Sequence, residues 1–225
     1  AASMKQPIEK RHNRRAKRAE AIREQRKRAL LEVALHVFAE RGYHEARISD
    51  IVDRAGIARG TFYLYFKSKN AIFHALLDEL LARIRENMIG VSLEDGAPPI
   101  ETQIQQILER VLEVFVSNPA LTRIVLHEAV GLDQEVDRKL KDFYSRLHSW
   151  LKESLDNGVR IAFLRPTSSD LVAWAVLGAI KQMVQLLVES KGQGPTIAES
   201  AQALLDYSFL GLLPRHRGAT SSTPH

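Results

Sequence analysis

The chain has 225 residues, of which 45% are hydrophobic, and its formal net charge at pH 7 is +5. A chain of this length can bury a sizeable core in one or two domains, and its composition is neither that of a disordered protein nor that of a membrane protein. It contains no cysteine, which excludes disulfide frameworks, zinc–thiolate sites and thiol catalysis and suits a reducing cytoplasm.

The charge is concentrated at the amino end. Residues 1–28 contain 11 Lys/Arg and 3 Asp/Glu, whereas acidic residues are slightly in excess over the rest of the chain. This asymmetry favours a polyanionic partner for the amino end, although charge alone is equally compatible with a solvated tail that binds nothing. Residues 1–15 lack the apolar segment of a signal peptide, so we expect no secretory signal.

Helical periodicity runs along nearly the whole sequence, while strand-like alternation never lasts, so we predict an all-α fold. The first apolar stripe ends at Gly42, and a second, shorter stripe ends at Gly56. The stripes are formed by Leu30, Val33, Ala34, Val37 and Phe38, and then by Ile48, Ile51, Val52 and Ala55.

A third short helix is predicted over about 58–66, and Ser68 then caps a long fourth helix. After the loop at 90–99, turn residues divide the remaining chain into helices near 100–117, 119–131, 134–157, 168–190 and 196–212. The most apolar window, 171–188, carries Lys181 and two glutamines, which favours a buried or interface helix over a membrane span. The tail from Pro214 is expected to be disordered.

Three helices between Leu30 and Phe66, with a glycine turn before the third, predict a helix-turn-helix. In this motif the second helix of the pair enters the major groove of DNA. On a helix, Phe62 and Phe66 share one face and suit packing on the other two helices. Thr61, Leu64 and Tyr65 lie on the opposite side, with Tyr63 at the flank.

The outward residues have the chemistry that DNA recognition needs. Tyrosine hydroxyls and backbone N–H groups bind phosphate oxygens, Gly60 allows close approach of the backbone, and Arg59 offers a fork to guanine. Lys67 and Lys69 follow within reach of the DNA backbone. A plain core helix with exposed tyrosines explains Phe62 and Phe66, but not this polar and aromatic set.

Residues 38–73, "FAERGYHEARISDIVDRAGIARGTFYLYFKSKNAIF", closely resemble the DNA-binding signature of the TetR family of bacterial regulators. The resemblance implies a homodimer in which 168–190 and 196–212 of each subunit form a four-helix interface. It also implies a ligand cavity in the carboxyl-terminal bundle and a linking helix over about 69–88. The family's DNA contacts correspond here to Arg59, Gly60, Thr61, Tyr63, Tyr65 and Lys69.

The sequence departs from the family pattern at two helix caps. Arg47 stands where Ser or Thr is usual, and Ala58 where Ser is usual; each lost cap costs ~1 kcal/mol. Ser49 is an alternative cap for the second helix, and Arg47 is instead a candidate phosphate contact. The basic run 10–28 extends beyond the usual family start, either as an early helix along the DNA backbone or as a tail in a minor groove.

These patterns divide the chain into four parts. We expect a basic extension (1–22), a helix-turn-helix domain (23–70), a helical effector-binding and dimerisation domain (71–213) and a tail (214–225). A cavity between bundle helices is a common ligand site. The expected effector-binding residues are the polar or aromatic side chains at otherwise apolar positions, each of which also fits a core or interface role: His127, Tyr144, His148, Trp174 and Lys181.

Catalytic signatures are absent from the sequence. The one Glu-x-x-His motif, Glu9 to His12, lies in the basic run without a partner, and no phosphate loop or nucleophile elbow is present. We therefore expect no enzyme activity, no metal and no cofactor other than an unknown small-molecule effector.

The combined prediction is a cytoplasmic, nucleoid-associated transcriptional repressor without a membrane partner. As a homodimer it binds a palindromic operator on double-stranded DNA and is released by its effector. The alternative is a helical binding or enzymatic protein with a basic tail that does not read DNA.

Overall fold

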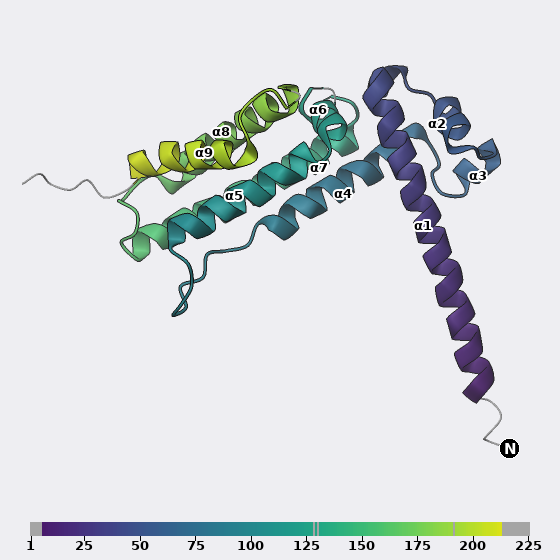
Figure 1. The fold of residues 1–225 in the computed structure, drawn as a ribbon, viewed down its shortest axis with the longest axis horizontal. Helices are drawn as coiled ribbons and strands as arrows, with labels where there is room; N and C mark the ends of the chain where they lie inside the picture. Colours follow the sequence, from purple (N-terminus) through teal and green to yellow (C-terminus); the bar gives the residue numbers. More distant parts are fainter. Residues whose placement is uncertain (1–5, 128, 130, 191, 213–225) are drawn as a thin grey trace, which may run out of the picture. The chain divides into compact units, whose positions relative to one another are not determined.

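The structure, a computed structural model, describes residues 6–127, 129, 131–190 and 192–212. Within these residues all the regular elements are α-helices, which confirms the predicted all-α fold (Figure 1). The helices are α1 (Gln6–Glu45), α2 (Ile48–Ala55), α3 (Arg59–Tyr63), α4 (Lys69–Asn87), α5 (Ile100–Val116), α6 (Pro119–His127), α7 (Gln134–Arg160), α8 (Ser169–Glu189) and α9 (Ile197–Leu212). The predicted tail, 214–225, lies outside the described residues.

The chain forms two compact units, one ending at Glu79 and the other starting at Leu80. The division falls inside α4, whereas the sequence pattern placed the boundary at the start of this helix. The first part of α4 belongs to the first unit because Phe73 packs in its aromatic core, with ring centroids 4.9 Å from Tyr43 and 6.4 Å from Phe38.

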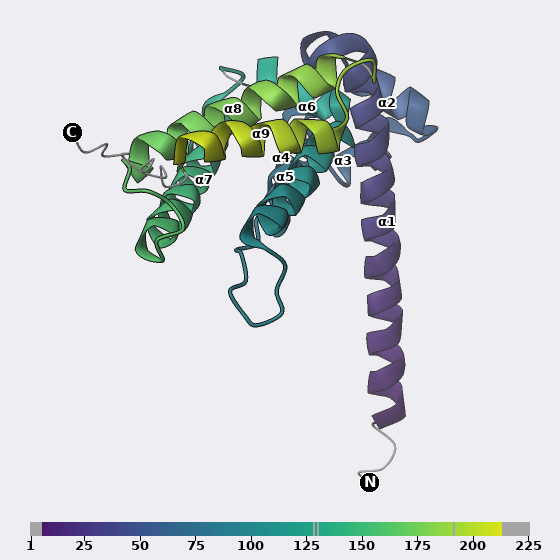
Figure 2. The same cartoon turned by 60° about the vertical axis from the view of Figure 1, so that its left-hand side comes forward.

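Helix α1 is much longer than the apolar stripe that begins at Leu30. It is helical from Gln6 until Gly42, whose φ of 74° and ψ of 162° break the helix as predicted. Leu30, Leu31 and Ala34 begin its buried face. In two views the preceding part of α1 projects beyond α2 and α3, with no other element of this unit beside it (Figures 1 and 2).

The second unit is a bundle of α5 to α9 with the end of α4. Helix α9 packs on α5 and α8, and α7 packs on α8. Leu112, Val184 and Leu204 lie in one buried cluster that joins α5, α8 and α9. Helix α9 begins with a reciprocal cap, because Thr196 Oγ1 accepts from Glu199 N (3.2 Å) and Glu199 Oε2 accepts from Thr196 N (2.8 Å).

Three predicted helix ends were wrong. Helix α3 ends at Tyr63 rather than at Phe66, because Leu64 and Tyr65 form a turn after it. Helix α7 does not end at Asn157 but continues to Arg160, because Gly158 is a packing glycine: a Cβ there would lie 2.7 Å from Leu164 Cδ1. Helix α6 ends at His127 rather than near Gly131. Just after this end, Ala129 N–H donates to Ile124 O (2.8 Å).

Helix α8 is long and apolar enough, by length and composition, to cross a membrane, yet such a helix also serves soluble proteins as a core or interface element. Only 22% of its apolar window is buried within the chain. Much of its apolar surface is therefore available to a partner.

Candidate nucleic-acid interface and ligand cavity

The turn between α2 and α3 is built around Gly56. This residue has φ 62° and ψ 34°, the left-handed region that glycine adopts without strain. Its N–H donates to Asp53 O (3.2 Å) and Ile57 N–H donates to Val52 O (3.2 Å), which closes the end of α2. The chain leaves this turn to begin α3 at Arg59.

Asp50 supplies the cap that Arg47 lacks at the start of α2. Its Oδ2 accepts the backbone N–H of Arg47 (2.8 Å), and its Oδ1 lies 3.1 Å from Arg41 NH1 of α1. A guanidinium has no acceptor, so Arg47 itself makes no side-chain cap. The guanidinium of Arg47 is exposed, and it forms no ion pair with another described residue.

Helix α3 has no side-chain cap, because Ala58 carries no acceptor. Thr61 N–H donates to Ala58 O (2.8 Å), and the helix has one turn only. Its position is secured by burial instead: Phe62 is 0% exposed and Phe66 is also buried. Apolar anchoring thus holds a short helix that local capping does not stabilise.

The side of α3 and of the turn after it that lies opposite Phe62 and Phe66 is open. Leu64 is 71% exposed, Tyr63 is exposed, and Thr61 and Tyr65 are half-buried. A Cβ on the exposed Gly60 would meet nothing within 4 Å, so nothing in the chain requires glycine there. The predicted separation of anchoring and outward side chains on this helix is therefore present.

The cations around α3 fall into two groups. Arg47, Arg59 and Lys67 are exposed and make no ion pair within the described part of the chain, although the Arg59 guanidinium lies 6.0 Å from the Tyr63 ring. Lys69 is different. Its Nζ donates to three backbone oxygens at the end of α1, those of Tyr43 (2.8 Å), His44 (3.0 Å) and Ala46 (2.9 Å).

All three N–H donors of Lys69 are therefore used in hydrogen bonds within the chain. The ammonium also lies 4.5 Å from the Tyr43 ring centroid, and burial lowers the pKa of Lys69 below its ordinary value. These contacts join the end of α1 to the start of α4.

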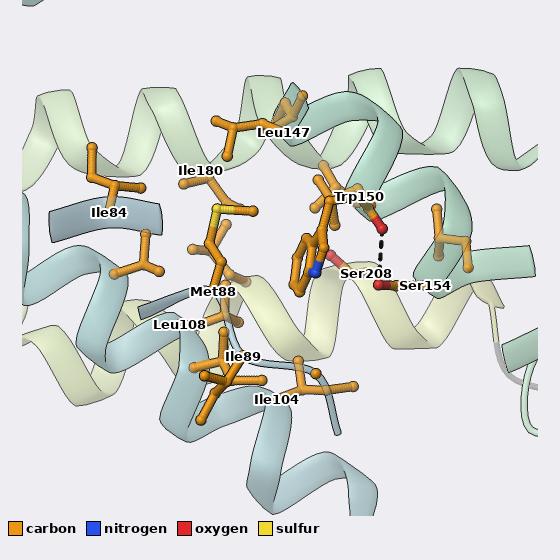
Figure 3. A pocket seen from close by; sticks show the side chains of 18 of the residues that line it. Ile84, Met88, Ile89, Ile104, Leu108, Leu147, Trp150, Ser154, Ile180 and Ser208 are labelled. Carbon is orange, nitrogen blue, oxygen red and sulfur yellow. Dashed lines mark hydrogen bonds between the residues drawn. The ribbon is translucent and has the colours of Figure 1, made fainter. Parts of the chain in front are cut away.

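The second unit contains a cavity of about 530 Å³. It is enclosed by the end of α4, the following loop, and α5 to α9, and its lining is overwhelmingly aliphatic and aromatic. Figure 3 shows Trp150 of α7 projecting into this space, with Ile84 of α4 and Met88, the residue after α4, among the other lining side chains. The volume lies within the range typical of small-molecule sites.

The lining contains few polar groups, and the charged ones among the described residues are all positive. Among the described residues, Arg160 and Lys181 are the only ionised side chains that line the cavity, and both are exposed. Asn157 accepts a hydrogen bond from Arg160, and Ser154 Oγ donates to Trp150 O (2.9 Å). Burial raises the pKa of Tyr144, which also lines the space.

Two of the five expected effector residues line the cavity and three do not. Tyr144 and Lys181 line the cavity, whereas His127, His148 and Trp174 do not. His127 is exposed, with Nε2 3.2 Å from Glu189 Oε1. His148 stacks on the exposed Trp174, with centroids 4.5 Å apart.

Two lining residues, Arg160 and Trp150, are not among the five expected effector residues. The Asn157-Gly158 pair predicts a helix end, which places Arg160 in a loop outside the helix. In the structure, Arg160 lies on the same helix as Trp150. The packing of Gly158 against Leu164, which the sequence does not reveal, is what identifies Gly158 as part of the helix.

A helix-turn-helix unit with an open reading helix, followed along the chain by a helical bundle, is typical of the class of DNA-binding regulators. Residues 30–76 match the family model "Bacterial regulatory proteins, tetR family". The chain is 30% identical over 195 residues to the uncharacterized HTH-type transcriptional regulator YdgC of Bacillus subtilis, covering 85% of this chain and 94% of that protein. The chain belongs to the TetR family, as its signature predicted, and is a DNA-binding transcriptional regulator.

Solved structures show the same fold. The ketosteroid transcriptional regulator KstR2 of Mycobacterium tuberculosis is 26% identical with a TM-score of 0.65, covering 84% of this chain and 96% of that one. The regulator FadR of Bacillus subtilis, solved in complex with stearoyl-CoA, is 20% identical with a TM-score of 0.62, covering 80% and 96%.

Proposed function

We propose that the protein is a homodimeric repressor that reads a palindromic operator with α3 and is released by an amphipathic anion bound in the bundle cavity. It would act on the nucleoid in the cytoplasm. The observation that carries the DNA-reading part is the exposed set on α3 and the turn after it, held outward by the buried Phe62 of α3 and the buried Phe66 that follows the turn.

We assign the residues of this surface to two roles. Arg59 offers its fork to a base edge, and the open space around Gly60 lets the helix backbone approach DNA. Tyr63, Tyr65, Thr61, Arg47 and Lys67 hold the phosphate backbone, which sets orientation rather than sequence. Lys69 is a positioning residue, because its ammonium is already bound to three carbonyl oxygens of the first unit.

The proposed dimer interface lies on one face of α8 with the exposed side of α9. Leu171 is 68% exposed and Trp174 and Leu186 are exposed on the same helical face, while Tyr207 of α9 is 72% exposed. Gly178 lies at the middle of this face, and a Cβ there would meet nothing within 4 Å. A small residue between large apolar ones lets two helices approach closely.

The proposed effector is a molecule with a long apolar body and an anionic group. The apolar lining accepts the body, and Arg160 and Lys181, with no lining acid to neutralise them within the described residues, accept the anion at the exposed edge. An acyl thioester of the kind bound by FadR, stearoyl-CoA, has this chemistry. Since the likeness to FadR concerns the fold, the charge pattern of the cavity is the main support.

Helix α4 provides the coupling. Its first part carries Lys69 and Phe73, which contact α1, and its second part supplies Leu80 and Ile84 to the cavity lining. An effector that fits the cavity better in one position of α4 shifts the helix-turn-helix units of the dimer away from the operator spacing. The effector acts only through this difference in affinity, for which 1–3 kcal/mol is typical.

Selection of bound sequences from random DNA tests the DNA-reading function. We expect a two-fold symmetric site bound at least ~10³-fold more tightly than bulk DNA at physiological salt. Its half-sites should lie about one helical turn of DNA apart, or a multiple of it, if two α3 helices of a dimer dock together.

Two variants separate the roles on α3. Arg59→Ala should relax preference at one base pair, at a cost of ~1–3 kcal/mol, whereas Tyr63→Ala should weaken binding to all sequences alike. Equal affinity of the wild-type protein for all duplexes would instead favour a helical protein that does not read DNA.

A further inference from the structure

Residues 17–29 of α1 carry positive charge that is unpaired within the described part of the chain. The helix-turn-helix core uses α1 only from Leu30, yet the helix already begins at Gln6. Over residues 17–29 the side chains are exposed, except for the half-buried Lys27, and include only two acids, Glu20 and Glu24. The basic side chains of this stretch are Lys17, Arg18, Arg23, Arg26, Lys27 and Arg28.

These six cations have no partner among the residues that the structure describes. None of them forms a hydrogen bond or ion pair with another residue that the structure describes. Alanine, glutamate, glutamine, lysine and arginine dominate the stretch and favour a helix without requiring a core to stabilise it. The segment therefore keeps a helical backbone and leaves its charge to an external partner.

We propose that residues 6–29 of α1 form a DNA-binding arm, which holds the phosphate backbone beside the bases read by α3 and does so independently of sequence. The helix is unbroken until Gly42, so the arm is attached to the helix-turn-helix without a flexible joint. At 1.5 Å per residue the arm is about 36 Å long. This length corresponds to about one turn of B-DNA, which gives the arm access to phosphates flanking the half-site.

The composition of the arm favours DNA over a lipid surface. A helix that lies on a membrane needs a continuous apolar face opposite its basic face. Between residues 17 and 29, Ile22 is the one large apolar side chain, and it is exposed among charged neighbours. The arm also shares its helix with a DNA-reading unit, which raises its effective concentration near phosphates.

The dependence of affinity on salt measures the phosphate contacts of the arm. Each contact adds about 0.9 to the slope of log K against log salt concentration on B-DNA. The arm variant carries Lys17→Gln, Arg18→Gln and Arg26→Gln, three exposed positions where glutamine keeps the helix. The control variant carries Lys141→Gln, Arg138→Gln and Arg146→Gln, exposed positions of α7 that remove the same number of lysines and arginines.

The probe is a labelled duplex of random sequence, titrated by fluorescence anisotropy over a series of KCl concentrations with the full-length protein. We expect the arm variant to have a slope shallower by about 0.9 per lost contact, up to about 5 for two arms of a dimer. The control variant should keep the wild-type slope. Circular dichroism of each variant checks that the helical content is unchanged.

Equal slopes for the arm variant and the wild type would overturn the proposal. Binding of the wild type to phosphatidylglycerol vesicles, lost in the arm variant while the DNA slope stays constant, would overturn it in favour of a membrane surface. Failure of α3 to select a sequence would leave the salt slope on random DNA unaffected. The arm and the reading helix are therefore tested separately.

Discussion

Gly60 lies within α3 and is exposed, and a Cβ there would meet nothing within 4 Å among the described residues beyond its chain neighbours and the backbone of its own helix. Its backbone is not in the left-handed region, so alanine fits without strain. Gly60→Ala should therefore leave the free energy of unfolding unchanged or raise it by up to ~1 kcal/mol, because alanine favours helix. DNA affinity should fall, since the added methyl group lies where the duplex approaches.

Urea unfolding and anisotropy on the selected operator measure the two effects of Gly60→Ala. Gly158→Ala is the matched control, because its Cβ would lie 2.7 Å from Leu164 Cδ1 in the second unit. That change should lower the free energy of unfolding without altering a DNA contact. Unchanged operator affinity in Gly60→Ala would show that the duplex does not approach this backbone.

At the scale of elements, a bidentate ion pair joins Arg54 of α2 to Glu40 of α1. Arg54 NH1 and NH2 donate to Glu40 Oε1 (2.8 Å) and Oε2 (2.6 Å), and the hydrogen bond from Arg54 holds the pKa of Glu40 below its ordinary value of 4.5. A carboxylate whose pKa is lowered on folding stabilises the folded state above the ordinary value. This contribution is lost as the pH falls through the lowered pKa.

Arg54→Gln should accordingly lower the melting temperature at pH 7 by a small amount, since the pair is exposed to solvent. The difference from the wild type should shrink as the pH falls below 4.5 and disappear below the lowered pKa, where Glu40 is protonated in both proteins. Calorimetry across this pH range measures the effect, with the exposed Arg85→Gln as the control. A difference independent of pH would mean that Arg54 acts through packing and not through the charge of Glu40.

For the whole molecule, the proposed effector and operator compete through the conformation of the dimer. Stearoyl-CoA should weaken operator binding, and by linkage the operator should weaken stearoyl-CoA binding by the same factor. Coenzyme A alone should have little effect, because it leaves the aliphatic lining unfilled. Anisotropy on the operator with increasing ligand measures the first factor, and calorimetric titration with and without DNA measures the second.

Two variants locate this effect in the cavity. Arg160→Gln should weaken the response by removing an anion partner, whereas Ile84→Trp should block it by filling the space that the cavity lining encloses. The exposed Arg138→Gln, which lies outside the lining, is the control for charge. Release by stearoyl-CoA that persists in Ile84→Trp would place the ligand elsewhere.

The sequence by itself determined the all-α class, the order of the helices, the family and the two faces of α3. These properties depend on local features: apolar spacing of 3.6 residues, glycines at Gly42 and Gly56, and a short motif that keeps Phe62 and Phe66 on one side of a turn of helix. Such signals need no knowledge of the residues distant in the chain.

Only the tertiary structure decided which distant groups meet. It showed that Lys69 binds carbonyl oxygens at the end of α1, that Gly158 makes room for Leu164, and that Arg160 reaches the cavity while His127 does not. The physical reason is that burial and hydrogen-bond partners come from packing between elements. One side chain in one local pattern can therefore be a surface charge or an internal clamp, depending on what folds against it.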